Sequence, residues 1–188
     1  MTELITLFRR AADGFGLHVH AVASGQWHDP TPCDDWDVRT LVNHVAVEQL
    51  WVPPLAGGST VADIGDRLDG DQLGNAPIAA WDAALEASLR AFEAPGALDG
   101  TVMLSSGERP MAEYCWEMTT DALIYSWDLA RGIGADDALD AELADLVYER
   151  TLPVAEQLQE TGLFAPPVPV PDDAPLQTKL LAIFGRRA

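Results

Sequence analysis

Polar side chains recur at helical spacing within one apolar segment of the chain. In "TTDALIYSWDLARG", Asp121, Tyr125 and Asp128 stand among Ala, Leu, Ile and Trp. Positions i, i+4 and i+7 share one face of an α-helix, and Glu117 extends that face by one more turn. The pattern predicts a helix that carries carboxylates and one phenol in a single row, called the acidic row below.

A second pair of chemically capable residues lies earlier in the chain. In "LVNHVAVEQLW", His44 and Glu48 are four residues apart and therefore lie on one helix face. Imidazole nitrogen and carboxylate oxygen are common zinc ligands. A lone histidine on an apolar stripe is more often a hydrogen-bonded core residue, and Glu48 can equally form a salt bridge. The pair by itself leaves both interpretations open.

Two arrangements of the acidic row are open. In the first, its upper end faces solvent, while Tyr125 and Asp128 make structural hydrogen bonds, for example to a backbone donor or to Arg131. In the second, the row faces the helix that carries His44 and encloses a polar cavity within a helical bundle. Carboxylates buried without a cation have raised pKa values or destabilise the fold, so the second arrangement favours a bound divalent ion.

The remaining sequence indicates which elements must position these residues. Apolar residues at helical spacing predict helices over 2–24, 37–50, 77–93, 110–132 and 137–159, with a short closing helix in "LQTKLLAIFG". Pro77 suits a first helical turn, whereas Pro153 should interrupt the last long helix. Asp35 or Asp37 can cap the second helix, and "PPLAGGST" is expected to end it.

The connecting segments are short of strand signals. "TVMLSSGERP" predicts either a short strand pair or an extended loop, and the acidic stretch 60–75 a loop with at most a short helical turn. The prolines of "FAPPVPVPDDAP" favour an extended, polyproline-like arm. The fold class that follows is all-α, a four-helix bundle with a short C-terminal helix and a proline-rich arm, in a single domain over residues 1–188.

Composition excludes several classes of protein. The chain has 188 residues, 48% of them hydrophobic and 22% charged, which is typical of a soluble globular protein. A net charge of −19 argues against nucleic acid or an anionic membrane as partner. There is no apolar run long enough for a membrane span and no signal peptide. Cys33 and Cys115 make no disulfide framework. We therefore expect a cytoplasmic protein.

Three motifs resemble a known family. They are "PTPCDDWDVRTLVNHV", "DALIYSWDLARGIGAD" and "LFAPPVPVPDDAPLQTKLLAIFGR". Together they resemble the DinB/YfiT-like superfamily, and within it the small metal-binding proteins related to the N-terminal domain of mycothiol-dependent maleylpyruvate isomerase. The resemblance implies a DinB-like four-helix bundle with zinc or nickel near one end of the core. It places the metal ligands at His44, Asp121 and Tyr125.

Tyr125 departs from the family pattern, which has histidine at that position. A phenol with a pKa of about 10 is neutral at ordinary pH and is a poor metal ligand. Zinc sites with tyrosine are far rarer than those with histidine. The substitution predicts weaker metal binding, with Glu48 or Glu117 as possible replacement ligands. Alternatively, His44, Asp121 and Tyr125 form a hydrogen-bonded cluster that needs no ion.

Two classes of function follow. By the resemblance, the chain is a metal-dependent transferase or isomerase that holds a low-molecular-weight thiol such as mycothiol as a thiolate and adds it to a small electrophile. The alternative is a non-catalytic binder of a small molecule, or a dimerisation module, with a degenerate metal site. Neither assigns a catalytic residue. Related bundles often pair, so a homodimer is possible.

Overall fold

The computed structural model describes residues 3–33, 35–160 and 165–188. The chain forms two compact units, Met1–Asp137 and Ala138–Ala188. Residue 2, at the start of the first predicted helix, and Phe164, at the start of the predicted arm, lie outside the described residues. Among the residues described, none of the helices combines the length and apolar character that crossing a membrane requires.

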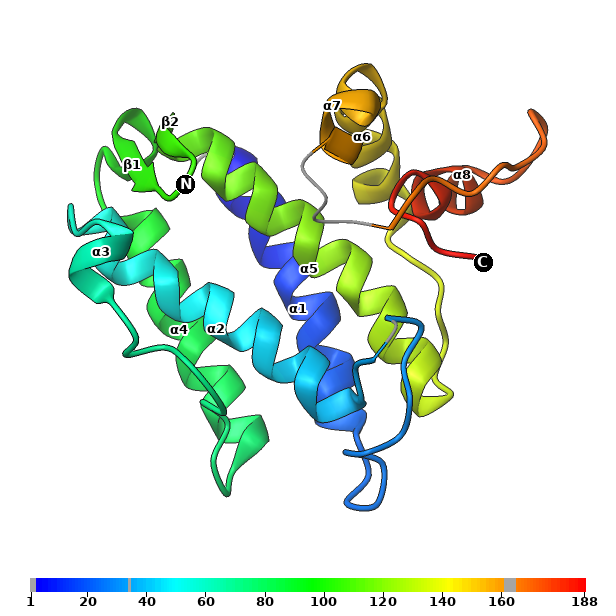
Figure 1. The fold of residues 1–188 in the computed structure, drawn as a ribbon, viewed down its shortest axis with the longest axis horizontal. Helices are drawn as coiled ribbons and strands as arrows, with labels where there is room; N and C mark the ends of the chain where they lie inside the picture. Colours follow the sequence, from blue (N-terminus) through cyan, green and yellow to red (C-terminus); the bar gives the residue numbers. More distant parts are fainter. Residues whose placement is uncertain (1–2, 34, 161–164) are drawn as a thin grey trace. The chain divides into compact units, whose positions relative to one another are not determined.

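Four long helices build the first unit. They are α1 (Glu3–Ala21), α2 (Val38–Ala56), α4 (Pro77–Glu93) and α5 (Met111–Ile133). Helix α1 packs along α5 and α2 packs along α4, while α2 also contacts α5 (Figure 1). These elements confirm four of the helices predicted from apolar spacing, including the start of α4 at Pro77.

The core of this unit is made of large side chains. Phe8, Phe15, Trp81 and Trp127 are all at most 1% exposed. The rings of Phe15 and Trp81 lie 4.8 Å apart between centroids and join α1 to α4. Burying one such side chain stabilises the fold by about 1.5–3 kcal/mol. The bundle is therefore held mainly by apolar contacts between its helices.

Helix α2 is longer than the sequence predicts. The predicted end at residue 50 is wrong, because the helix continues through Pro53 and Pro54 to Ala56. "PPLAGGST" does end the helix, but at its glycines rather than at its prolines. Val52 and Leu55 are buried on either side of the two prolines, so packing of the last turn outweighs the local cost of proline. The helix begins where predicted, since the Asp37 carboxylate accepts a hydrogen bond from the Thr40 N–H at 2.8 Å.

The connections are short elements. Helix α3 (Val61–Ile64) is the predicted short turn, and the 3-10 helix η1 covers Ala97–Asp99. Strands β1 (Thr101–Leu104) and β2 (Gly107–Pro110) form an antiparallel hairpin with Thr101 opposite Pro110. Of the two predictions for this segment the strand pair is confirmed, and the fold is mostly helical with one small hairpin.

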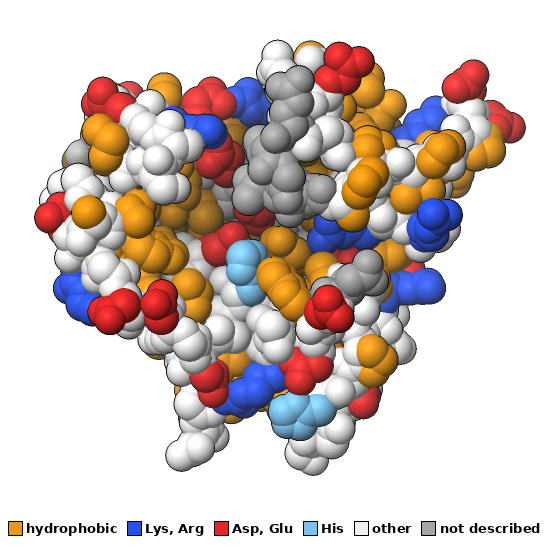
Figure 2. Space-filling model, in the orientation of Figure 1, with side chains coloured by type: hydrophobic (Ala, Val, Ile, Leu, Met, Phe, Trp, Pro, Cys, Tyr) orange, Lys and Arg blue, Asp and Glu red, His pale blue; other side chains and the backbone are white. Residues whose placement is uncertain are grey.

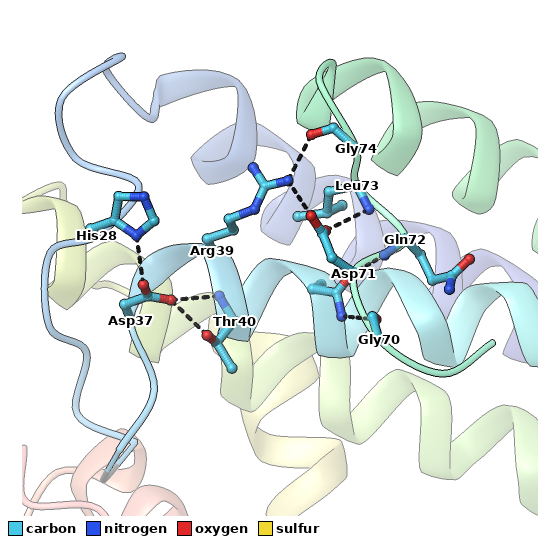
Figure 3. Close-up of polar contacts among 10 residues, drawn as sticks. His28, Asp37, Arg39, Thr40, Gly70, Asp71, Gln72, Leu73 and Gly74 are labelled. Carbon is cyan, nitrogen blue, oxygen red and sulfur yellow. Dashed lines mark hydrogen bonds and ion pairs between the residues drawn. The ribbon is translucent and has the colours of Figure 1, made fainter. Parts of the chain in front are cut away.

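A loop between α3 and α4 is tied to α2 (Figure 3). The Arg39 guanidinium donates to the Asp71 carboxylate at 2.6 Å. The Asn43 side chain donates to the carbonyl of Gly70 at 3.0 Å. Leu73, between these attachments and α4, is only 2% exposed and belongs to the same apolar cluster as Tyr125. The loop thus fixes one face of α2 while the neighbouring face, with His44, stays open to other contacts.

The second unit is smaller and also helical. It contains α6 (Ala141–Thr151), the 3-10 helix η2 (Leu152–Val154), α7 (Ala155–Glu160) and α8 (Leu176–Ile183). The predicted interruption at Pro153 is confirmed, because this residue lies in η2. The described part of the proline-rich arm has no helix or strand and turns at Asp172 and Asp173, and the Val168 N–H donates to the Ala182 carbonyl at 3.0 Å. This bond holds the arm against α8.

Candidate functional site

Helices α2 and α5 bring two of the predicted site residues together. The rings of His44 and Tyr125 have centroids 5.3 Å apart and meet edge to face at 75°. His44 lies on α2 and Tyr125 on α5, and the two helices run side by side at this level (Figure 1). The acidic row therefore faces α2 at Tyr125.

A tryptophan from the preceding loop completes the group. The Trp36 ring lies 4.7 Å from that of His44 and 6.1 Å from that of Tyr125, nearly parallel to the latter at 26°. These three residues, called the aromatic site below, are not equally covered. Tyr125 is 7% exposed, the His44 side chain is 35% exposed, and Trp36 is half-buried. The aromatic site is thus open on the side of Trp36 and His44.

Glu48 pairs with the imidazole of the aromatic site. His44 Nε2 and Glu48 Oε1 are 3.1 Å apart, as their i, i+4 spacing predicts. The second carboxylate oxygen, Glu48 Oε2, is shielded from solvent and has no hydrogen-bond partner among the described residues. A shielded, unpaired carboxylate oxygen lowers stability. The site therefore retains an acceptor that the described part of the fold does not use.

Negative charge is concentrated around this part of α5. Burial raises the pKa of Tyr114 far above its ordinary value, and the nearby charges of Glu48, Glu117 and Asp121 raise it further. Tyr114 consequently stays neutral. Burial also raises the pKa of Glu117, although its ion pair with Arg109 works in the opposite direction. Figure 2 shows acidic and apolar side chains next to pale blue histidine atoms on the face of the molecule that it draws.

The fit of a metal ion can be tested on these donors. The sequence predicts zinc or nickel held by His44, Asp121 and Tyr125. In residues 3–33, 35–160 and 165–188, no group of three or more His, Cys, Asp and Glu side chains is placed to hold a metal ion. His44 and Glu48 supply one nitrogen and one oxygen, whereas a zinc site takes three or four protein ligands. The described donors do not fit such a centre, and the metal ligands stay a prediction.

A thiol–carboxylate hydrogen bond attaches the Trp36 loop to α5. Cys33 Sγ donates to Asp128 Oδ2 at 3.2 Å, and Asp128 is fully buried. Thr31 Oγ1 donates to the carbonyl of Trp36 at 2.9 Å within the same loop. Arg131, one of the partners predicted for Asp128, donates instead to Asp137. Asp128 thus holds the loop that supplies Trp36.

Sequence reasoning found part of this site. It singled out His44, Glu48 and Tyr125 from helical spacing, but it missed Trp36 and the Cys33–Asp128 bond. Trp36 stands just before the Asp37 cap, in the first of the three motifs quoted above. That position was the available signal, because the residue before an N-cap lies beside the first turns of its helix.

Comparisons with known proteins identify the family and the fold. Residues 8–130 match the model of the mycothiol maleylpyruvate isomerase N-terminal domain family. Two Mycobacterium tuberculosis proteins, the uncharacterized proteins Rv0738 of strain H37Rv and MT0763 of strain CDC 1551, are each 34% identical over 181 residues, which cover 95% of this chain and 94% of theirs. A crystal structure of a mutant of the mycothiol-dependent maleylpyruvate isomerase superposes with a TM-score of 0.63 and 15% identity, over 82% of this chain and 71% of that one. At that identity the likeness concerns the fold alone.

Proposed function

The chain belongs to the mycothiol maleylpyruvate isomerase N-terminal domain family, and we propose that it binds a small molecule at the aromatic site between α2 and α5 without a metal centre of three protein ligands. Ligand sites in helical bundles are built from side chains of facing helices. Here α2 contributes His44 and Glu48, α5 contributes Tyr125, and the preceding loop contributes Trp36.

The observation that carries this proposal is the environment of the His44 imidazole. Its Nε2 is engaged by Glu48 at 3.1 Å, and its ring lies against both Trp36 and Tyr125. A half-exposed imidazole with a polar partner and two aromatic walls combines apolar surface with an oriented polar group. That combination is typical of small-molecule sites.

A metal-dependent thiol transferase or isomerase is the second candidate. One observation favours it, namely that Glu48 Oε2 is shielded and unpartnered, among the described residues, beside an imidazole nitrogen. The structural relative named above is mycothiol-dependent, which makes a low-molecular-weight thiol the natural ligand to test first. The described donors do not form a three-ligand group, so this candidate rests on the shielded oxygen and on the family resemblance.

A fragment screen tests the proposal directly. The protein is labelled with 5-fluorotryptophan, and its fluorine NMR spectrum is recorded with a library of small neutral, cationic, anionic and thiol-containing compounds. We expect saturable shifts of the Trp36 resonance, assigned through Trp36→Phe, and their loss in His44→Ala. His20→Ala is the matched control, because His20 pairs with Asp82 on α4. If no compound shifts the Trp36 resonance, the proposal is wrong.

Metal analysis separates the two candidates. The protein is purified without a histidine tag and its zinc and nickel contents are measured by mass spectrometry, with His44→Ala and Tyr125→His in parallel. We expect less than one bound ion per chain, and a gain in zinc affinity of about tenfold or more in Tyr125→His, which restores an imidazole ligand. Stoichiometric metal that disappears in His44→Ala would favour the metal-dependent candidate.

Partners and location stay predictions. We propose that the chain acts in the cytoplasm, that it binds neither nucleic acid nor membranes, and that it can form a homodimer. The net charge of −19 supports the exclusion of polyanionic partners. Light scattering over a range of protein concentrations measures the oligomeric state, and a monomer at all concentrations would exclude the dimer.

A further inference from the structure

We propose that the ligand of the aromatic site is a compact organic cation, an ammonium or guanidinium group packed against Trp36 and Tyr125 and facing the carboxylate of Glu48. This inference rests on the proposed function and names the ligand class of the same site. It differs from the metal prediction, because the rings rather than three donor atoms would hold the charge.

The rings supply the first argument. Trp36 and Tyr125 are nearly parallel at 26°, whereas His44 is inclined to Trp36 by 50° and to Tyr125 by 75°. The three rings thus form one contiguous aromatic cluster whose members are inclined to one another. Aromatic faces attract cations, with tryptophan the strongest, and groups of such rings bind quaternary ammonium ions.

The unused carboxylate oxygen supplies the second argument. Glu48 Oε1 contacts His44, but Oε2 is shielded from solvent and has no hydrogen-bond partner in the described part of the chain. A cation beside this carboxylate would compensate charge that has lost its water. An anion would be repelled, so a free carboxylate or phosphate does not suit this position.

The surrounding potential acts in the same direction. Glu48, Glu117 and Asp121 all raise the pKa of Tyr114, which shows that carboxylates from α2 and α5 act on one region. The nearby Arg109 pairs with Glu117. Together with a net charge of −19 over the whole chain, this arrangement raises the local concentration of cations near the open side of the site.

Access comes from the side of Trp36 and His44. The His44 side chain is 35% exposed and that of Glu48 is 23% exposed, so neither is sealed inside the bundle. Tyr125, at 7% exposure, forms the inner wall. A compact cation can therefore approach Trp36, His44 and the exposed part of Glu48 from solvent.

A pair of probes with one shape and different charge tests the inference. Choline carries a quaternary ammonium group, and 3,3-dimethyl-1-butanol replaces its nitrogen with carbon and is neutral. Their binding is measured by calorimetry and by the fluorine resonance of Trp36. We expect choline to bind at least about tenfold more tightly than the alcohol, and its binding to weaken as sodium chloride is raised.

Substitutions at one carboxylate identify its role. Glu48→Gln keeps the shape of the side chain and removes its charge, so we expect choline affinity to fall about tenfold while that of the alcohol is unchanged. Glu86→Gln is the matched control, since Glu86 pairs with Arg90 on the exposed surface of α4 and should leave both affinities unchanged. Thermal melting verifies that each variant is folded. Trp36→Phe tests the contribution of the indole, because it keeps a smaller aromatic ring at this position.

The possible outcomes separate this inference from the proposed function. Equal affinity for choline and the alcohol, both reduced in Trp36→Phe, would overturn the cation and leave a small-molecule site. A failure of choline to bind, while other fragments shift the Trp36 resonance, would also overturn the cation and leave a small-molecule site. If zinc displaces choline one for one and His44→Ala abolishes zinc binding, the negative region belongs to a metal and the inference is overturned. If no fragment shifts Trp36, the proposed function fails with it.

Discussion

Two aromatic pairs in the first unit have almost the same ring geometry and opposite surroundings. Phe15 and Trp81 lie 4.8 Å apart at 57°, and Trp36 and His44 lie 4.7 Å apart at 50°. The first pair is at most 1% exposed, whereas the second is half-exposed and joins Glu48. Ring separation alone therefore does not define a role. Closure by neighbouring helices makes the first pair stabilising, and incomplete closure leaves the second available to a ligand.

The greatest loss of stability should come from removing the tryptophan of the first pair, and removing the tryptophan of the second pair should cost much less. Trp81→Ala should lower the free energy of unfolding by about 3–5 kcal/mol, because it leaves a cavity in a closed core. Trp36→Ala should lower it by about 1–2 kcal/mol, because water already reaches this ring. Urea unfolding followed by circular dichroism measures both. Similar losses in the two variants would mean that Trp36 is a core residue like Trp81.

The attachment of the Trp36 loop is the next most sensitive point. Asp128→Ala should lower the free energy of unfolding by about 2–3 kcal/mol, because it removes a fully buried carboxylate that accepts a hydrogen bond from the Cys33 thiol. Cys33→Ala removes only the thiol donor and should cost about 1 kcal/mol. Urea unfolding measures both losses. Both variants should also weaken fragment binding at the aromatic site, whereas Cys115→Ala should not.

One result in particular would contradict this role of the loop attachment. If Asp128→Ala is destabilised but binds fragments like the wild type, the loop keeps Trp36 in place by other contacts. In that case the Cys33–Asp128 bond contributes to stability alone.

Features that depend on local contacts could be predicted from the sequence, whereas features that depend on distant contacts could not. Apolar spacing gave the helices of the bundle, and four-residue spacing gave the pairing of His44 with Glu48. These features depend on residues within one or two turns of each other. The sequence left two arrangements of the acidic row open. The resemblance to a known family favoured the one in which Tyr125 faces His44.

The rest depends on contacts that no local pattern records. Cys33 and Asp128 are 95 residues apart in sequence, and nothing in either motif announces their bond. The continuation of α2 through Pro53 and Pro54 is likewise decided by burial of Val52 and Leu55, a property of the folded core. Local propensity indicates a stop there, and tertiary packing overrides it.

A smaller effect is expected at the start of the helix that carries His44. Partial desolvation favours a higher pKa for Asp37, but hydrogen bonds from the Thr40 side chain, His28 and the Thr40 backbone outweigh it, so the net pKa is lowered (Figure 3). Asp37→Ala should lower the free energy of unfolding by about 1 kcal/mol near neutral pH. Chemical unfolding at a series of pH values measures this loss.

The sign of its pH dependence follows from the lowered pKa. A depressed carboxyl pKa stabilises the folded state above the unfolded-state value of about 3.9, and this contribution disappears as the pH falls through the folded-state pKa. The difference in the free energy of unfolding between wild type and Asp37→Ala should therefore be constant at neutral pH and become smaller below about pH 4. Asp37→Asn, which keeps a capping oxygen without a charge, should show a smaller difference with little pH dependence. A difference that instead widens in acid would be inconsistent with a lowered pKa.

The smallest difference in stability should appear between substitutions at two glycines of α1, which test how tightly the Phe15–Trp81 pair is packed. A Cβ added at Gly14 would have its nearest neighbour, Ser126 Oγ, at 3.9 Å, whereas one added at Gly16 would lie 3.0 Å from Trp81 Nε1. Gly14→Ala should raise the free energy of unfolding by about 0.5–1 kcal/mol through helix propensity. Gly16→Ala gains the same propensity but must displace a ring held at 1% exposure, and we expect a net loss of about 1 kcal/mol. Thermal melting of the two variants measures the contrast. If Gly16→Ala is as stable as Gly14→Ala, Trp81 can shift within its surroundings, and the Phe15–Trp81 pair is less tightly packed than its burial indicates.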